Sequence, residues 1–355
     1  MKKIAITFLA ITFMSLIFAL TFFQDFALAT NFTTQQAACP LCGNKVKVNT
    51  LISTNSFGGH DTDLLPYASG NQPLLILPAF CDKCYYCGYC ADFATVETEV
   101  LAKLKNEIIT KKSISPPESI FYDAAAASSP AASPAPAFIK YDLMAQTYKI
   151  AGRETSEVFS QYLNAAWALR LERELCFDLM SPQAQNAVEW MNKNIDLTSI
   201  DTTENNNAAV ELATGRLLLK RAAGLTGDDL MNCSLGALFL LRSHGENREA
   251  EKALEFLRAV LNPDSFNTLE KKVKESIALE RKYLRLALES LESDLAAGKI
   301  TGDFQLARVY YLAGELSRRC LDFSAAKKYY QKADSLKKLT PPLDRYVIKQ
   351  QELCD

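Results

Sequence analysis

The pattern of apolar and polar positions near the start of the chain predicts short strands. Residues 45–53 (KVKVNTLIS) alternate polar and apolar side chains, many of them β-branched, which predicts a strand. Residues 74–80 (LLILPAF) form a short apolar run that also predicts a strand, and Pro78 places it at a sheet edge. Over 93–112 the apolar spacing becomes helical. Residues 31–112 therefore predict a small, mostly β head with a trailing helix.

Beyond the head, the pattern is helical almost throughout 138–339. Ala, Leu, Glu, Lys and Arg dominate, proline is sparse, and short turns such as His244-Gly245 separate neighbouring helices. Residues 340–355 carry no clear pattern and are set apart as a C-terminal tail. The expected helices are 138–151, 154–178, 181–193, 206–223, 227–243, 246–261, 265–297, 302–319 and 322–338.

Residues 307–333 match the spacing of a tetratricopeptide helix pair, which places small and aromatic residues where two antiparallel helices cross. Weaker echoes span 141–166 and 236–257, which predicts a short, irregular α-solenoid. An ordinary antiparallel helical bundle is the alternative. The expected packing positions are Gly314 in the first helix and Phe323, Ala326, Tyr330 and Ala333 in the second.

Two segments lie outside these patterns. Residues 113–137 are rich in Ser, Pro and Ala, which predicts a linker or long loop. At the N-terminus, two lysines precede the apolar run 4–23, and small residues precede a cleavage point after Ala29, as in a secretory signal peptide. The run is also long enough to be an uncleaved membrane anchor. Residues 1–29 therefore predict an exported protein that is periplasmic, extracellular, or tethered to the membrane by residues 4–23.

Composition and motifs narrow the function classes. The chain has 355 residues, enough for two or three domains, and a net charge of -2, so no basic surplus points to nucleic acid or anionic lipid. It has two histidines and lacks the GxSxG, phosphate-loop and HExxH motifs. We therefore expect no enzymatic activity. Any contact with a membrane would be made through the N-terminal segment.

Cysteine spacing is the sharpest chemical signal. Of ten cysteines, six lie between Cys39 and Cys90, in Cys39-Pro-Leu-Cys42-Gly43 and in a run with cysteines at 81, 84, 87 and 90. Paired CxxC units are typical of four-thiolate zinc sites, which leave no position open for water and are therefore structural. Disulfides, expected in an oxidising compartment, and a four-iron cluster are the alternatives. The other four cysteines read as buried small hydrophobic residues.

The loop between the CxxC units carries a polar group formed by His60, Asp61 and Asp63. Two carboxylates and an imidazole can bind a metal or perform acid–base chemistry. We favour a structural role, in which Asp61 and Asp63 accept hydrogen bonds from backbone amides of their own loop and brace the head. His60 as a fourth zinc ligand in place of one cysteine is a further alternative.

In combination, these motifs resemble a bacterial family called domain of unknown function 2225. The resemblance covers most of the chain beyond residue 35. The segments that carry it are Cys39–Gly43, Asp61–Leu64, Asn71–Leu74, Cys84–Tyr89 and Tyr162–Arg170. The signal-like N-terminus and the Pro/Ala-rich linker depart from the family pattern.

The resemblance implies a cysteine-rich head followed by tetratricopeptide-like helices. The family's second CxxCGY unit falls on Cys84 and Cys87, so the implied zinc ligands are Cys39, Cys42, Cys84 and Cys87, with Cys81 and Cys90 as alternates. The expected fold class is mainly α, with a small zinc-ribbon-like β head before an antiparallel, tetratricopeptide-like α-solenoid.

The expected function is that of a scaffold or adaptor. A structural zinc would stabilise the head, and the helical domain would bind an unidentified protein partner. The alternative is an envelope protein that uses its CxxC cluster for thiol–disulfide or metal handling. An enzyme built on the loop of Asp61 and Asp63 is a third, weaker hypothesis.

Overall fold

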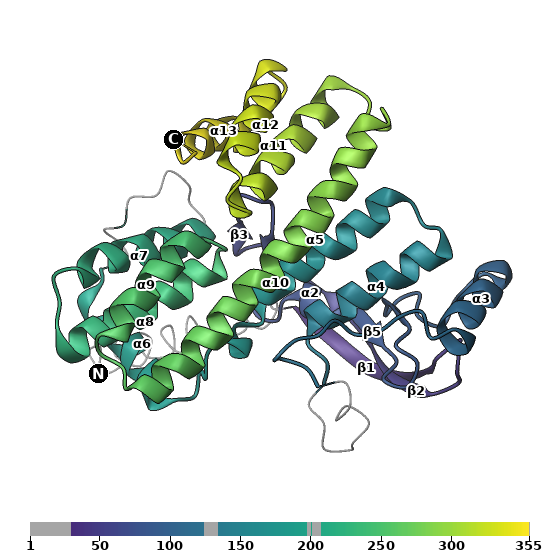
Figure 1. The fold of residues 1–355 in the computed structure, drawn as a ribbon, viewed down its shortest axis with the longest axis horizontal. Helices are drawn as coiled ribbons and strands as arrows, with labels where there is room; N and C mark the ends of the chain where they lie inside the picture. Colours follow the sequence, from purple (N-terminus) through teal and green to yellow (C-terminus); the bar gives the residue numbers. More distant parts are fainter. Residues whose placement is uncertain (1–29, 124–133, 197–199, 201–206, 355) are drawn as a thin grey trace, which may run out of the picture.

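The computed structural model describes residues 30–123, 134–196, 200 and 207–354 (Figure 1). The predicted signal peptide or anchor at 1–29, and ten residues of the predicted linker, lie outside the described residues. Within the described ranges, no helix combines the length and apolarity that crossing a membrane requires.

The head contains three two-stranded antiparallel sheets. The predicted strand at 45–53 is confirmed as β2, and it pairs with β1, which the mostly polar sequence NFTTQQAA had not indicated. The strand bounds are β1 Asn31–Ala38, β2 Lys45–Ser53, β3 Gly59–His60, β4 Pro66–Tyr67, β5 Pro78–Phe80 and β6 Cys87–Tyr89.

The prediction of one strand over 74–80 is wrong in its first half. Pro73–Ile76 forms the short helix α2, and only Pro78–Phe80 is the strand β5. Pro73 occupies the first turn of α2, where its fixed φ favours a helix, and Leu74 and Leu75 pack against the core beneath α4 and α5. The helix expected over 93–112 is shorter, with α3 at Thr98–Leu104 and a π-helical turn, η1, at Lys105–Thr110.

The expected helices of the second part are all present, with small differences at their ends. Arg173–Leu175 is a separate 3₁₀ turn, η3, beyond the end of α5. The segment set apart as a tail contains the helix α13, whose Leu343, Tyr346 and Val347 pack against α12. The helices are α4 Ala137–Ala151, α5 Thr155–Leu171, α6 Pro182–Asn194, α7 Asn207–Ala222, α8 Gly227–Ser243, α9 Asn247–Arg258, α10 Pro263–Ala296, α11 Asp303–Arg319, α12 Phe323–Ser335 and α13 Leu343–Glu352.

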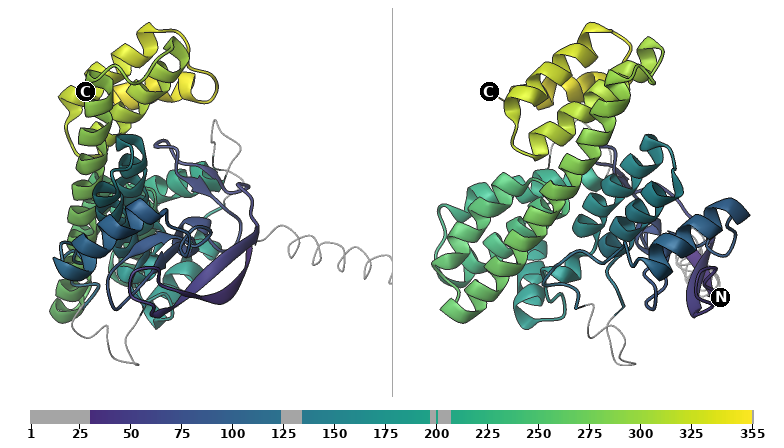
Figure 2. Two further views of the ribbon diagram at one scale, coloured as in Figure 1. Left: turned by 90° about the vertical axis from the view of Figure 1, so that its right-hand side faces the viewer. Right: turned by 45° about the vertical axis from the view of Figure 1, so that its right-hand side comes forward.

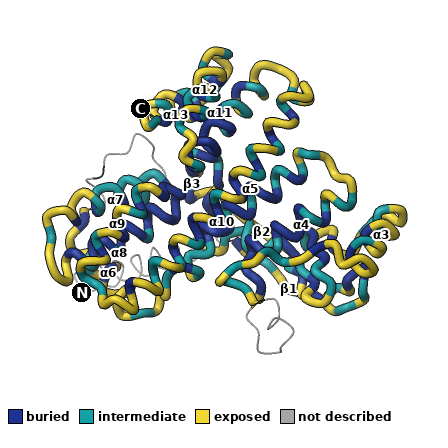
Figure 3. The backbone as a smooth tube through the Cα atoms, in the orientation of Figure 1, coloured by how far each residue is buried: buried dark blue, intermediate teal, exposed yellow. Residues whose placement is uncertain are grey.

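The 34-residue helix α10 organises the helical part. Its first half packs on the group α6–α9, its middle packs on α4 and α5 beside the head, and α11–α13 lie at its far end (Figures 1 and 2). Buried positions gather along α5, α8 and the middle of α10, whereas α3 at the edge is largely exposed (Figure 3). The fold is therefore mainly helical, with small sheets at its N-terminal end.

The helices α11 and α12 cross at the predicted glycine. A Cβ atom on Gly314 would lie 2.5 Å from Cε1 of Tyr330, so only glycine permits this approach. Ala326, Tyr330 and Ala333 are fully buried at the crossing, and Phe323 is half-buried. The packing agrees with the expected positions, while the assignment of a tetratricopeptide solenoid stays a prediction.

Gly314→Ala should destabilise the protein, because the added methyl overlaps a buried ring that cannot move away without repacking. Overpacking of this kind costs about 1–3 kcal/mol. Urea unfolding should show that loss, whereas Gly224→Ala, whose Cβ would meet its nearest neighbour at 3.9 Å, should change stability by less than about 0.5 kcal/mol. Equal stability of the two variants would contradict the close crossing.

Candidate functional site

The first CxxC unit forms the loop of the β1–β2 hairpin. Cys39 N–H donates to the carbonyl of Asn44 at 2.8 Å, and Gly43 N–H donates to the carbonyl of Cys39 at 2.9 Å. Gly43 has φ +73°, a left-handed conformation that costs glycine little. The turn closes tightly and aims Cys39 and Cys42 to the same side, as the CxxCG spacing predicted.

The loop of the β5–β6 hairpin repeats this geometry with different residues. Cys81 N–H donates to the carbonyl of Tyr86 at 3.0 Å, and Tyr85 N–H donates to the carbonyl of Cys81 at 2.8 Å. Tyr85 takes the left-handed position, with φ +65°, that Gly43 fills in the first loop. The second metal-type loop is therefore Cys81-x-x-Cys84-Tyr85.

The two loops bring four sulfurs together. The Sγ atoms of Cys39, Cys42, Cys81 and Cys84 all lie within 4.8 Å of one another. The closest contacts join one loop to the other, at 3.6 Å between Cys39 and Cys84 and 3.5 Å between Cys42 and Cys81. Tetrahedral Zn–S bonds of about 2.3 Å place neighbouring sulfurs about 3.8 Å apart. Four cysteines at these distances can hold one metal ion.

The structure differs from the predicted ligand set in one residue. Cys81, named as an alternate, lies in the cluster, and Cys87 does not: its thiol is buried in β6 and donates to the carbonyl of Ala79 at 2.9 Å. The other alternate, Cys90, accepts a hydrogen bond from Asn49 N–H at 3.1 Å. His60 lies in β3 and is not part of the four-residue cluster.

The surroundings of the cluster suit bound thiolates. Asn44 Nδ2 lies 3.8 Å from Cys81 Sγ and donates to Asp82 Oδ1 at 2.8 Å, which ties the two loops together. Hydrogen bonds with Cys39 and Cys84 lower the pKa of Cys81, and those with Cys39 and Cys81 raise the pKa of Cys84. Four neighbouring thiols ionise together only beside a cation, so the cluster is chemically matched to a metal ion.

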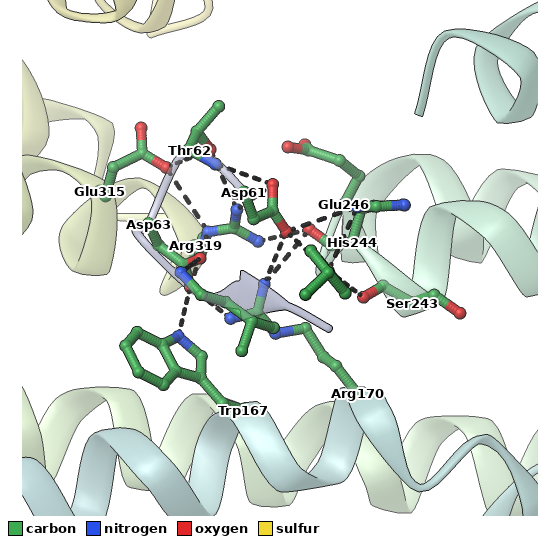
Figure 4. Close-up of polar contacts among 12 residues, drawn as sticks. Asp61, Thr62, Asp63, Trp167, Arg170, Ser243, His244, Glu246, Glu315 and Arg319 are labelled. Carbon is green, nitrogen blue, oxygen red and sulfur yellow. Dashed lines mark hydrogen bonds and ion pairs between the residues drawn. The ribbon is translucent and has the colours of Figure 1, made fainter. Parts of the chain in front are cut away.

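The Asp-Thr-Asp motif lies away from the cysteines, in a buried ionic network (Figure 4). Asp61 and Asp63, from the loop between β3 and β4, are 3% and 0% exposed, so their charges require partners. Arg170 of α5 contacts both carboxylates, with its Nη1 3.0 Å from Asp61 Oδ2. Arg319 of α11 lies 3.4 Å from Asp61 and 3.5 Å from Asp63. Trp167 Nε1 donates to Asp63 at 3.0 Å.

Bracing of their own loop is only part of what Asp61 and Asp63 do. Asp61 Oδ1 does accept a hydrogen bond from Thr62 N–H at 2.8 Å within its own loop. The Tyr67 hydroxyl of β4 also donates to Asp61 at 3.4 Å, and further contacts fasten the loop to the helices. Thr62 Oγ1 donates to Glu315 at 2.8 Å, and its carbonyl accepts from the Tyr311 hydroxyl at 2.6 Å. The head is thereby anchored inside the helical part.

The network extends through five buried carboxylates and four buried arginines. Glu280 of α10 lies 3.4 Å from Arg170 of α5 and 2.6 Å from Arg242 of α8, so it links the three helices. Arg318 contacts Glu246 at 3.1 Å and Glu315 at 3.2 Å. The members are Asp61, Asp63, Glu246, Glu280, Glu315, Arg170, Arg242, Arg318 and Arg319.

Electrostatics within the network favour the charged forms of Asp61 and Glu246. Burial opposes ionisation of Asp61, but Arg319, His244 and Arg170 hold the pKa of Asp61 well below its usual range. Burial likewise opposes ionisation of Glu246, yet Arg318 and Arg319 lower the pKa of Glu246 to about 2. With His244 protonated, five positive groups face five negative ones.

The turn after α8 completes the network. His244 is buried, with Nδ1 3.6 Å from Asp61 and Nε2 3.3 Å from Glu211. Its carbonyl accepts a hydrogen bond from Arg319 Nη1 at 2.6 Å. Gly245 has φ +67°, and a Cβ there would lie 2.2 Å from Arg319 Nη1, so glycine is what allows the arginine to enter.

The fold and the site define a class: a mainly helical protein with a four-cysteine cluster in paired hairpin loops and a buried ionic anchor. The chain belongs to the family described as an uncharacterized protein conserved in bacteria, DUF2225, whose match spans residues 32–352. This confirms the resemblance found in the sequence. No curated protein and no solved structure matches the chain.

Arg170→Met should destabilise the protein strongly, because it leaves the buried carboxylates of Asp61, Asp63 and Glu280 short of one cation. Removing one partner of a buried ion pair costs about 3–5 kcal/mol. The matched control is Arg258→Met, which breaks an exposed 3.0 Å pair with Glu270 and should cost less than about 1 kcal/mol. Urea denaturation of both variants tests the difference, and similar losses would show that the network is energetically unimportant.

Stability should fall as pH rises above about 6.5, the ordinary pKa of histidine. Burial opposes protonation of His244, but hydrogen bonds with Asp61 and Glu211 raise its pKa. Protonated His244 therefore stabilises the folded protein fully below about pH 6.5, and this stabilisation is lost as the pH rises through the raised pKa. Arg170 and Arg319 donate to the backbone carbonyl of His244 and not to its ring. Thermal melts from pH 6 to 9 should be flatter for His244→Asn than for wild type or for His60→Asn. Parallel curves for all three would refute the effect.

Proposed function

We propose that this protein is a non-enzymatic scaffold or adaptor in which a structural zinc ion stabilises the head and the helical part binds a protein partner. The four-sulfur cluster is the observation that carries the proposal. Zinc suits four thiolates at tetrahedral spacing, and a site with four protein ligands is closed to substrate. Zinc would hold together two hairpin loops that share one small core.

The buried ionic network supports a structural role and not a catalytic one. Each of its five carboxylates contacts at least one arginine, so their charges are directed at one another. An acid–base pair awaiting substrate needs a group that is reachable and poised to exchange a proton. The carboxylates of Asp61 and Asp63 are instead buried, against Arg170 of α5 and Arg319 of α11.

A thiol–disulfide function is supported less well. A redox CxxC exchanges a disulfide between the two cysteines of one unit. Here the closest sulfur contacts, 3.5 Å and 3.6 Å, join separate loops, which is the arrangement a shared metal ion requires. The signal-like residues 1–29 support export, or anchoring through residues 4–23, and a bound zinc would protect the thiols from oxidation there.

Cys81→Ser should abolish zinc binding, whereas Cys87→Ser should leave it intact, because only Cys81 belongs to the cluster. Metal analysis of the purified proteins should give about one zinc per chain for wild type and Cys87→Ser, and far less for Cys81→Ser. Chelator under denaturing conditions should release four protected thiols from wild type.

Controls separate the ligand set from general damage. Cys90→Ser, at the other alternate position, should retain zinc as wild type does. Loss of zinc from Cys87→Ser with retention in Cys81→Ser would restore the set implied by the family's CxxCGY unit. Wild-type protein without metal, with Cys39 to Cys84 paired as disulfides, would overturn the zinc proposal.

A further inference from the structure

A large apolar groove opens away from the four-cysteine cluster, between α6, α8 and the start of α10. Its volume is about 1080 Å³, slightly above the 300–1,000 Å³ that small-molecule pockets commonly occupy. Half-buried apolar side chains form its walls, namely Phe177, Met191, Met231, Leu235, Phe239 and Leu261.

The helix α6 covers the groove only loosely. Ala187 is the sole residue of α6 that is buried, and α6 approaches α8 closely where a Cβ on Gly236 would lie 2.7 Å from Met191 Sδ. At the mouth of the groove, Leu179 and Val188 are 36% and 51% exposed. Apolar surface therefore continues from the walls of the groove to its rim, which marks it as an interaction site.

Methionine and charge indicate the kind of occupant. Met191 and Met231 line the groove, and methionine side chains adapt their shape to helical partners. The charged residues of the lining are Asp178, Glu189, Asp264 and Lys272, a net surplus of two negative charges. Among the described residues, these three acids form no ion pair and are exposed, although Asp178 Oδ1 accepts a hydrogen bond from Met180 N–H at 3.1 Å.

We propose that this groove binds an amphipathic helix of a partner protein, whose apolar face enters the groove and whose flanking lysines or arginines meet the acidic rim. Helix-in-groove recognition uses an apolar stripe at positions i, i+3, i+4 and i+7, and rim charges select the partner. The inference rests on the proposed protein-binding role and names both its surface and its partner class.

The test uses the full chain and a fluorescein-labelled helical peptide of about 18 residues, built of leucines at i, i+3, i+4 and i+7 with lysines elsewhere. Fluorescence anisotropy should show saturable binding that weakens with salt. A peptide with the same leucines and glutamates in place of lysines should bind at least about tenfold more weakly. Equal binding of the two peptides would overturn the basic-helix assignment.

Surface variants locate the binding site without disturbing the core. Val188→Glu, on the rim, should weaken the lysine peptide at least about tenfold, whereas Ile348→Glu, at a similarly exposed position on α13, should not. Glu189→Lys should weaken it several-fold and reduce the salt dependence, while Glu255→Lys on α9 should have no effect. Circular dichroism melts verify that all four variants fold.

Two outcomes would refute the groove inference. If the lysine peptide bound Val188→Glu as tightly as wild type, any helix-binding surface would lie elsewhere on the protein. Stoichiometric binding of dodecanoate with no binding of the peptide would make the groove a site for small apolar molecules. Crosslinking in cells distinguishes failure of the groove inference from failure of the scaffold proposal. If wild type and Val188→Glu crosslink equally to one partner, the scaffold proposal stands but the groove is not the partner's binding site.

Discussion

The fold depends on the insertion of a charged loop from the head into the interior of the helical part. Arg170 lies 109 residues from Asp61 along the chain, and Arg319 lies 257 residues from Thr62, yet all of them meet in one enclosed network. An unpaired charge in that position would cost several kcal/mol, so neither the loop nor the arginines are stable there alone. The head and the helices α5, α8, α10 and α11 therefore adopt their positions together.

A buried ion-pair network of this kind contributes more to geometry than to net stability. Desolvation of each group offsets much of its attraction to its partners, and apolar residues of equal volume often stabilise a core as well. What the network does provide is a defined place for one loop, because Asp61 and Asp63 both contact Arg170 and Arg319 from two different helices. A metal ion held by the four-cysteine cluster would act in the same way in the head, where the cluster joins two hairpin loops that share a small core.

Local patterns were enough to predict most elements but not the contacts between them. The alternation over residues 45–53 and the apolar spacing of the helices reflect burial of one face, which is a property of each segment. The second cysteine loop was misassigned because the family's CxxCGY unit matches Cys84 and Cys87, which Gly88 follows. The structure places the left-handed residue at Tyr85, which glycine rules do not find. The network was missed because Arg170 and Arg319 are ordinary helix residues until distant segments bring carboxylates to them.

The distribution of polar groups between interior and surface bears on where a partner would bind. The interior charges are matched to one another, and a metal ion held by all four cysteines would have no open position for a second molecule. The groove beside α6 is different, because half-buried apolar walls and exposed acids lie together there. In the described part of this chain, α6 is the helix of the second part that buries least of itself, which is why the proposed binding surface lies beside it.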